Sequence, residues 1–122
     1  MATINSFREL LVWQKAMDLT VRSFKLARTL PRDEQPALGT ELPRSALSIP
    51  SNVAEGFSRH SLGSYINHLH VAHASDAELE TQLEVTTRLK FADPEICRVL
   101  IGDCQEVARM INGLVRSPER GR

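Results

Sequence analysis

The chain has 122 residues, of which 15 are basic and 15 acidic, so its formal net charge is zero. A chain of this length forms one domain, because two smaller units could not each bury a core. Its 42% hydrophobic and 25% charged residues exclude an intrinsically disordered protein, and no apolar run reaches the ~20 residues of a membrane span. The first ten residues lack a basic stretch followed by an apolar one, so we expect no secretory signal and a cytoplasmic protein without membrane contact.

Charge is unevenly distributed along the chain. Residues 1–32 contain six bases and two acids, whereas residues 62–96 contain two bases and six acids. The chain as a whole therefore lacks the basic field of a dedicated nucleic-acid binder. Its basic first segment and acidic third segment are complementary and could attract each other across a contact between subunits.

Apolar residues recur at helical spacing in four segments, and no segment shows the alternation of a strand. Pro31 ends the first helix, Ser61 caps the third, and Asp93 with the following proline begins the fourth. Such helices with short connections predict an all-α, up-and-down antiparallel four-helix bundle. The predicted helices cover residues 7–29, 38–57, 61–90 and 94–116, and residues 117–122 form a frayed tail.

The first helix carries two apolar stripes. The first, which we expect in the core, contains Leu10, Trp13, Met17, Val21, Phe24 and Ala27. The second lies about 160° around the helix, taking ~100° per residue, and contains Val12, Leu19 and Leu26. Scattered surface leucines are normal, but a second stripe flanked by basic residues is better explained as a contact with another subunit. Its expected partner is the acidic third helix with Asp76, Glu78, Glu80 and Glu84.

The second helix contains two prolines. Thr40 is a candidate cap that leaves Pro43 in the first turn, where a missing N–H costs nothing. Pro50 lies within the apolar stripe, so we expect it to leave the carbonyl of Ala46 without its helical partner and to bend the helix.

No motif of known catalytic chemistry is present, so we expect no enzyme and no cofactor. Glu-x-x-His repeats, phosphate-binding glycine loops and nucleophile elbows are all missing. His73, Asp76 and Glu80 have a spacing that could hold a surface metal ion, but solvated charge explains them equally, and we assign no metal site. Cys97 and Cys104 lie about 10 Å apart if helical, too far for a disulfide, and are core thiols or at most a pair between subunits.

Three sequence strings resemble one known family. They are FRELLVWQKA from Phe7, SALSIPSNVAEG from Ser45 and ELETQL from Glu78, and Arg59 and Ser61 extend the second string. Across residues 7–90 they resemble the four helix bundle protein family encoded in intervening sequences of bacterial 23S ribosomal RNA genes.

The resemblance implies an antiparallel four-helix bundle that assembles into a homopentameric ring and has no established enzymatic role. It also implies kinship with the accessory variability protein of diversity-generating retroelements, which binds nucleic acid and a reverse transcriptase through a basic surface. This sequence departs from the pattern at Pro43, where the family commonly has a basic or polar residue beside Arg44, and in its neutral charge.

Two interpretations of the motif residues remain open, one structural and one in which they face a ligand. In the structural one, Pro50 bends the helix, Gly56 ends it, and Asn52 or Glu55 bonds the freed backbone. The acidic side chains of the third string lie at a helix or subunit contact, where Arg44 or Arg59 pairs with them. The motif residues are Trp13, Arg44, Pro50, Asn52, Glu55, Gly56, Arg59, Glu78, Glu80 and Gln82.

From these observations we expect a non-enzymatic, oligomeric helical-bundle adaptor that binds RNA, DNA or a nucleic-acid-processing protein. The alternative is a structural or regulatory protein scaffold that binds no nucleic acid. The candidate nucleic-acid contacts form a basic ridge of Arg8, Lys15, Arg22, Lys25 and Arg32. In the competing account, these cations dock against the acidic third helix of a neighbouring subunit.

Overall fold

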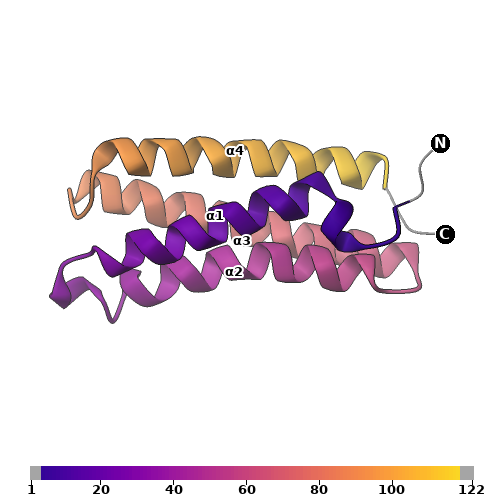
Figure 1. The fold of residues 1–122 in the computed structure, drawn as a ribbon, viewed down its shortest axis with the longest axis horizontal. Coiled ribbons are helices and arrows are strands. Elements are labelled where there is room, and N and C mark those ends of the chain that lie inside the picture. The colour runs from indigo at the N-terminus through magenta and orange to yellow at the C-terminus, as the bar shows by residue number, and fades with distance from the viewer. Residues whose placement is uncertain (1–3, 119–122) are drawn as a thin grey trace.

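The protein is an antiparallel bundle of four helices (Figure 1). The computed structural model describes residues 4–118, and no strand occurs in that range. Successive helices run in opposite directions, and the start of α1 lies at the same end of the bundle as the end of α4. The all-helical bundle expected from the sequence is thus confirmed. Its elements are a short 3-10 turn η1 (Phe7–Glu9), α1 (Leu11–Arg28), a second 3-10 turn η2 (Arg32–Glu34), α2 (Leu38–Phe57), α3 (Leu62–Arg88) and α4 (Pro94–Arg116).

Polar side chains cap two of the long helices as the sequence predicts. The Ser61 hydroxyl accepts a hydrogen bond from the backbone N–H of Ser64 at 3.1 Å at the start of α3. The Asp93 carboxylate accepts one from the N–H of Glu95 at 2.8 Å, and Pro94 follows at the first position of α4. Each cap satisfies an N–H that has no partner inside its helix.

The first predicted helix is divided in two. The Ser6 hydroxyl caps η1 by accepting from the N–H of Arg8, and the chain then becomes extended at Leu10, with φ −72° and ψ 125°. α1 therefore begins only at Leu11. At the other end of the chain, the predicted tail falls largely on residues 119–122, which lie outside the described range.

α2 continues without interruption through both prolines. It begins at Leu38, so Pro43 lies in the second turn rather than the first. The Thr40 hydroxyl donates to the carbonyl of Gln35 at 3.1 Å and does not cap the helix. The prediction that Thr40 caps this helix is therefore wrong.

The orientation of α1 is the main correction to the sequence analysis. Val12, Leu19 and Leu26, predicted to contact another subunit, are buried in the core of the single chain. Val21 and Phe24, predicted in the core, are 48% and 38% exposed. The helix is turned so that its small buried side chains, Ala16, Thr20, Ser23 and Ala27, face the neighbouring helices, which allows close approach.

Two further observations concern the core and the surface. Cys97 and Cys104 are both free and buried, as expected for core thiols. Within residues 4–118, no helix combines the length and the apolar character needed to cross a lipid bilayer.

Candidate interaction surfaces

Two cations of the predicted basic ridge are bound within the chain. Lys15 Nζ lies 3.3 Å from one carboxylate oxygen of Asp103 on α4, and a guanidinium nitrogen of Arg22 lies 2.9 Å from the other. Arg22 also lies 3.6 Å from Asp18, one turn earlier on α1. The side chain of Asp103 is only 17% exposed, so the pairs are partly shielded from solvent. These cations are neutralised, as the competing account requires, but by α4 of the same chain.

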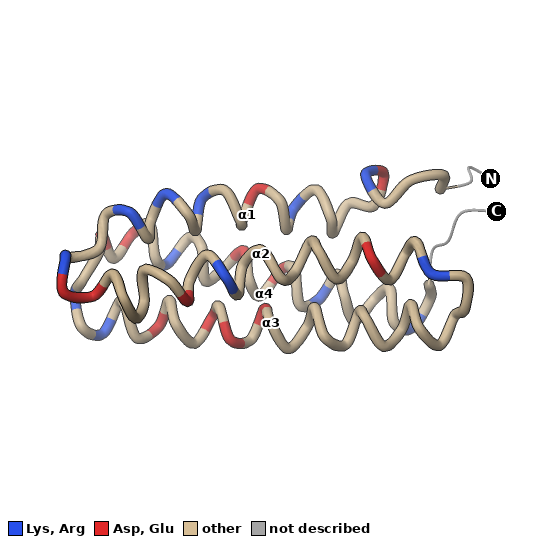
Figure 2. Tube along the Cα trace, turned by 90° about the horizontal axis from the view of Figure 1, so that it is seen from below, with Lys and Arg blue, Asp and Glu red and all other residues tan. Residues whose placement is uncertain are grey.

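The other cations of the ridge lie apart from one another. Arg8 lies near the start of α1, with its guanidinium carbon 4.7 Å from the centre of the Phe7 ring. Lys25 and Arg32 lie near the other end of α1, and both are exposed. Arg28, which was not among the predicted contacts, is exposed in the same region. Figure 2 shows the basic residues gathered towards this end of α1.

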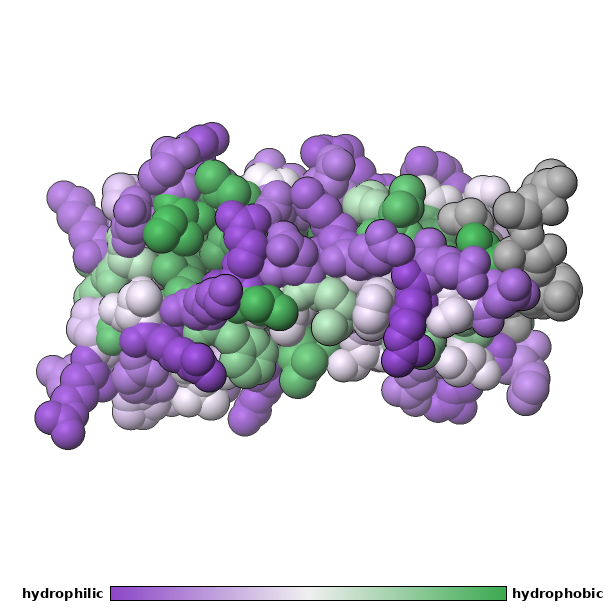
Figure 3. Space-filling model, in the orientation of Figure 1, coloured by the Kyte–Doolittle hydropathy of each residue, from purple (hydrophilic) through white to green (hydrophobic). Residues whose placement is uncertain are grey.

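An apolar patch covers the outer side of α1 and α2. Val21, Phe24 and Leu47 are each between 38% and 48% exposed, and Met17 and Pro43 are half-buried. A hydrogen bond from Thr20 to the carbonyl of Ala46 joins the two helices directly beside Val21 and Leu47. Figure 3 shows hydrophobic side chains near the middle of the molecule, where α1 and α2 lie side by side in Figure 1. We call these residues the α1–α2 patch: Met17, Val21, Phe24, Pro43 and Leu47.

The outer face of α3 carries an acidic groove. Two shallow hollows of about 480 and 290 Å³ meet at Ala77 and Thr81, whose side chains are small and line both of them. Their rims contain the carboxylates of Glu78, Glu80 and Glu84, and the larger hollow is also lined by Val85 and Arg88. Glu80 accepts a hydrogen bond from the side chain of Gln105 on α4 at 3.3 Å, so this edge of the groove adjoins α4. We call it the α3 groove.

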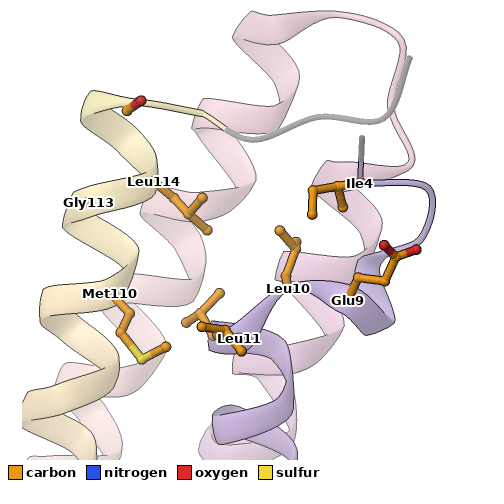
Figure 4. A pocket seen from close by; sticks show the side chains of 9 residues that line it. Ile4, Glu9, Leu10, Leu11, Met110, Gly113 and Leu114 are labelled. Carbon is orange, nitrogen blue, oxygen red and sulfur yellow. The ribbon is translucent and has the colours of Figure 1, made fainter. Parts of the chain in front are cut away.

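The seam between α1 and α4 opens on both sides of Asp103. Towards the start of α1, a hollow of about 660 Å³ is lined by Ile4, Leu10 and Leu11 on one side and by Met110 and Leu114 on the other (Figure 4). Towards the end of α1, a hollow of about 490 Å³ includes apolar side chains and Lys25. Both are mainly apolar and show no cluster of groups suited to catalysis.

Several motif residues connect α2 to α3. The Asn52 amide donates to the carbonyl of Ser48 at 2.8 Å and lies 3.1 Å from its hydroxyl. That hydroxyl is 2.7 Å from the hydroxyl of Ser75 on α3. Gln82 of α3 donates to the Ser45 hydroxyl at 3.0 Å. This arrangement supports a structural role, although Asn52 does not bond the carbonyl that Pro50 leaves without a partner.

A second group of motif residues lies near the end of α2. The Glu55 carboxylate accepts from Arg59 at 2.6 Å and lies 3.4 Å from the imidazole of His68 on α3. The Arg59 hydrogen bond, with a further contribution from the His68 charge, lowers the pKa of Glu55. Gly56 does not end the helix. A Cβ at Gly56 would lie 2.7 Å from the Cβ of His68, so glycine permits a close approach of α2 to α3.

Within residues 4–118 of the single chain, the two arginines predicted to pair with the acidic residues of α3 form ion pairs with acidic residues of α2. Their pairing with α3 across a contact between subunits stays a prediction. Arg44 lies 3.9 Å from Glu41, on its own helix, and Arg59 binds Glu55. Glu78 is exposed on the outer face of α3. Trp13, the motif aromatic of α1, packs against Phe7 with 5.3 Å between the ring centres.

Asp76 is an acidic residue in the core, with 1% of its surface exposed. Burial, and secondarily the charge of Glu80, raises its pKa to about 7, while a hydrogen bond from the Cys104 thiol opposes this shift. Burial and the Asp76 charge also raise the pKa of that thiol. The Oδ1 atom of Asp76 has no hydrogen-bond partner within residues 4–118. In the same range, no three His, Cys, Asp or Glu residues are arranged so that they could hold a metal ion. This includes His73, Asp76 and Glu80, whose spacing was noted in the sequence.

Comparisons with known proteins agree with this architecture. The family model described as 23S rRNA-intervening sequence protein matches residues 8–113. The crystal structure of a protein of unknown function from the S23 ribosomal protein family of Bacteroides thetaiotaomicron is similar, with a TM-score of 0.81. It is 23% identical to this chain, and the match covers 88% of this chain and 96% of that one. At this identity the likeness establishes the fold alone. No curated protein matches the chain.

Proposed function

Because the chain belongs to the 23S rRNA-intervening sequence protein family over residues 8–113, we propose that it is a non-enzymatic, oligomeric adaptor that binds nucleic acid or a nucleoprotein. The observation that carries this proposal is a pair of exposed cations, one in the last turn of α1 and one in η2. Lys25 and Arg32 are exposed, and neither takes part in an ion pair among residues 4–118. Phosphate groups bind such cations with release of counterions.

Oligomerisation is the second part of the proposal. The sequence resemblance implies a homopentameric ring, and the exposed α1–α2 patch supports self-association, because large apolar side chains gathered at a surface favour a protein contact. A ring repeats Lys25 and Arg32 around the assembly, so that a chain of zero net charge presents several local basic sites. We assign this role to the cytoplasm, the compartment expected from the sequence.

Fluorescence anisotropy with labelled RNA and duplex DNA tests nucleic-acid binding. We expect weak binding with little sequence preference, since Phe24, the exposed aromatic residue beside Lys25, belongs to the patch assigned to self-association and is not available to stack on bases. Each phosphate contact contributes about 0.9 to the salt slope for duplex DNA and about 0.7 for single strands.

Two matched variants distinguish binding at the proposed site from a general effect of the protein's net charge. The Lys25→Glu, Arg32→Glu variant should lose binding, and light scattering of the same variant shows whether that loss follows from a change in its oligomeric state. The Arg98→Glu, Arg109→Glu variant has the same charge change on α4, where both arginines are exposed, and should retain binding. Equal losses in both variants would contradict the assigned site. The absence of any binding at 50 mM salt and tens of micromolar protein would leave the protein scaffold as the function.

The scaffold alternative has an observation of its own in favour. Lys15 and Arg22 are bound to Asp103, so the continuous basic ridge expected from the sequence is reduced. A protein partner that contacts the α1–α2 patch needs no phosphate-binding site.

A further inference from the structure

We infer that copies of this chain associate head to tail, with the α1–α2 patch of one copy in the α3 groove of the next. The inference rests on the self-association proposed above and identifies the two surfaces that meet. It requires that the surfaces fit in shape, in charge and in position along the bundle.

The two surfaces are complementary in shape. On the patch, Val21 and Phe24 are three residues apart on one side of α1 and project as a ridge of large apolar side chains. In the groove, Ala77 and Thr81 are four residues apart on one side of α3, and their small side chains leave the two hollows open. Ridges of one helix that pack into grooves of another are the usual geometry of helix contacts.

The charges at their edges are also complementary. Arg28 lies four residues after Phe24, on the same side of α1, and is exposed. Glu78 and Glu84 line the groove and are exposed. Glu84 lies 3.3 Å from Arg88 on its own helix, an exposed pair of a kind that contributes little stability. Docking therefore brings Arg28 towards an acidic rim and leaves Lys25, on a neighbouring side of α1, at the edge of the contact.

The two surfaces lie at the same height along the bundle. Thr20 of α1 bonds the carbonyl of Ala46, and Gln82 of α3 bonds the side chain of the adjacent Ser45. Val21 in the patch and Thr81 in the groove, which are adjacent in sequence to Thr20 and Gln82, are therefore at similar heights along the bundle. A second copy displaced sideways, with no shift along the bundle, places them opposite each other. In a closed ring whose symmetry axis is parallel to the bundles, neighbouring copies are related by rotation alone, with no displacement along the bundle.

The surfaces face opposite ways, so one chain cannot cover its own groove. α1 and α3 lie at opposite edges of the bundle in Figure 2. The patch lies on the side shared by α1 and α2, and the groove adjoins α4 through Glu80 and Gln105. Each copy thus has a patch that can contact one neighbour and a groove that can contact another, which is the condition for a heterologous contact.

Mixing two surface variants tests this arrangement by light scattering after size-exclusion chromatography. Val21→Glu disables the patch, and Ala77→Arg fills the groove. We expect the unmodified protein to be oligomeric and each variant alone to be monomeric. An equimolar mixture should form a 1:1 dimer, because the intact patch of the Ala77→Arg variant still fits the intact groove of the Val21→Glu variant.

Matched controls use exposed residues outside both surfaces. Ile96→Glu changes an apolar residue on α4 that is 45% exposed, close to the 48% of Val21, and Asn112→Arg adds an arginine to α4. Both should assemble like the unmodified protein. Circular dichroism and thermal melting check folding, and Leu47→Glu with Thr81→Arg provides a second pair if one of the first pair fails to fold.

The outcomes distinguish this inference from the proposed function. An unmodified protein that is monomeric at micromolar concentration overturns both the self-association and the contact. An oligomeric protein whose variants stay assembled, or whose mixture stays monomeric, overturns the head-to-tail contact alone. If Val21→Glu dissociates the assembly and Ala77→Arg does not, the patch pairs with another patch and the inference is wrong.

Discussion

The Thr20 hydroxyl lies 3.0 Å from the carbonyl oxygen of Ala46, the backbone group that Pro50 leaves without its helical partner. The same hydroxyl lies 2.7 Å from the carbonyl of Ala16, so its single proton is shared between one carbonyl of α1 and one carbonyl of α2. A side chain of α1 thus compensates for a proline in α2. This contact also fixes the rotation of α1, because Thr20 faces α2 and directs Val21 to the surface.

We expect Thr20→Val to lower the free energy of unfolding by about 1–3 kcal/mol, because it leaves the buried Ala46 carbonyl without a donor. Pro50→Ala supplies an N–H to that carbonyl, so Thr20→Val should cost less in the Pro50→Ala background. Urea unfolding of the two single variants and the double variant measures this coupling. Thr86→Val is the control, because the Thr86 hydroxyl bonds a carbonyl of its own helix. Strictly additive effects would show that Thr20 does not compensate for Pro50.

The sequence predicts most of the fold because three of the four helices have one dominant apolar stripe. Leu69, Leu79 and Leu83 of α3 are buried as their spacing predicts. In α1 both stripes are apolar and have the same period, so periodicity does not decide between them. The choice depends on contacts with residues far away in sequence, such as Ala46, that a local pattern does not contain.

The candidate site was predictable only in part for the same reason. The heptad spacing of Lys15 and Arg22 correctly indicates that they lie on one side of α1. Their partner Asp103 lies 81 residues beyond Arg22 in the chain, and no local signal connects them. Arg28 was missed because it is outside the heptad spacing, although its charge and its place near the end of the helix are visible in the sequence.

Asp76 should make folding stability depend on pH. Its pKa is about 7 in the folded protein, compared with the ordinary value of 3.8 expected in the unfolded chain. Between these values the folded protein holds a proton that the unfolded chain has lost, so stability decreases as pH rises through this window. The total effect is on the order of 4 kcal/mol, at ~1.4 kcal/mol per pH unit. Glu80 on α3 is the charged group that acts on Asp76. Asp103 on α4 acts on the Cys104 thiol and is itself bound by Lys15 and Arg22 of α1.

The variant Asp76→Asn tests this dependence. It should unfold at a higher urea concentration than the unmodified protein at pH 8 and show little difference at pH 4.5, where Asp76 is protonated in the folded state. Glu78→Gln, at an exposed position of the same helix, should leave the pH dependence unchanged. A parallel pH dependence in the Asp76→Asn variant and the unmodified protein would exclude Asp76 as its source.

Under the proposed function, Asp103 should link stability to nucleic-acid binding, because it holds two cations of α1. Asp103→Asn should destabilise the fold by about 1 kcal/mol, the range of partly exposed ion pairs. It should also strengthen binding to RNA and steepen the salt slope by up to about 0.7 for each cation that reaches a phosphate. Glu106→Gln, which releases the exposed Arg109 on α4, is the control. Unchanged affinity with the expected loss of stability would mean that Lys15 and Arg22 serve only the seam between α1 and α4.

Gly56 should tolerate no side chain, because α3 approaches α2 closely there. In Gly56→Ala the new Cβ would lie 2.7 Å from the Cβ of His68 and 3.2 Å from the carbonyl oxygen of Tyr65. Neither atom is the far end of a flexible side chain, so the helices must separate, at a cost of about 1–3 kcal/mol. Gly113→Ala is the matched control, since a Cβ there meets nothing within 4 Å, and it should stabilise α4 by up to about 1 kcal/mol. Thermal unfolding of both variants checks the contrast, and a Gly56→Ala variant as stable as Gly113→Ala would show that the close approach is not required for the fold.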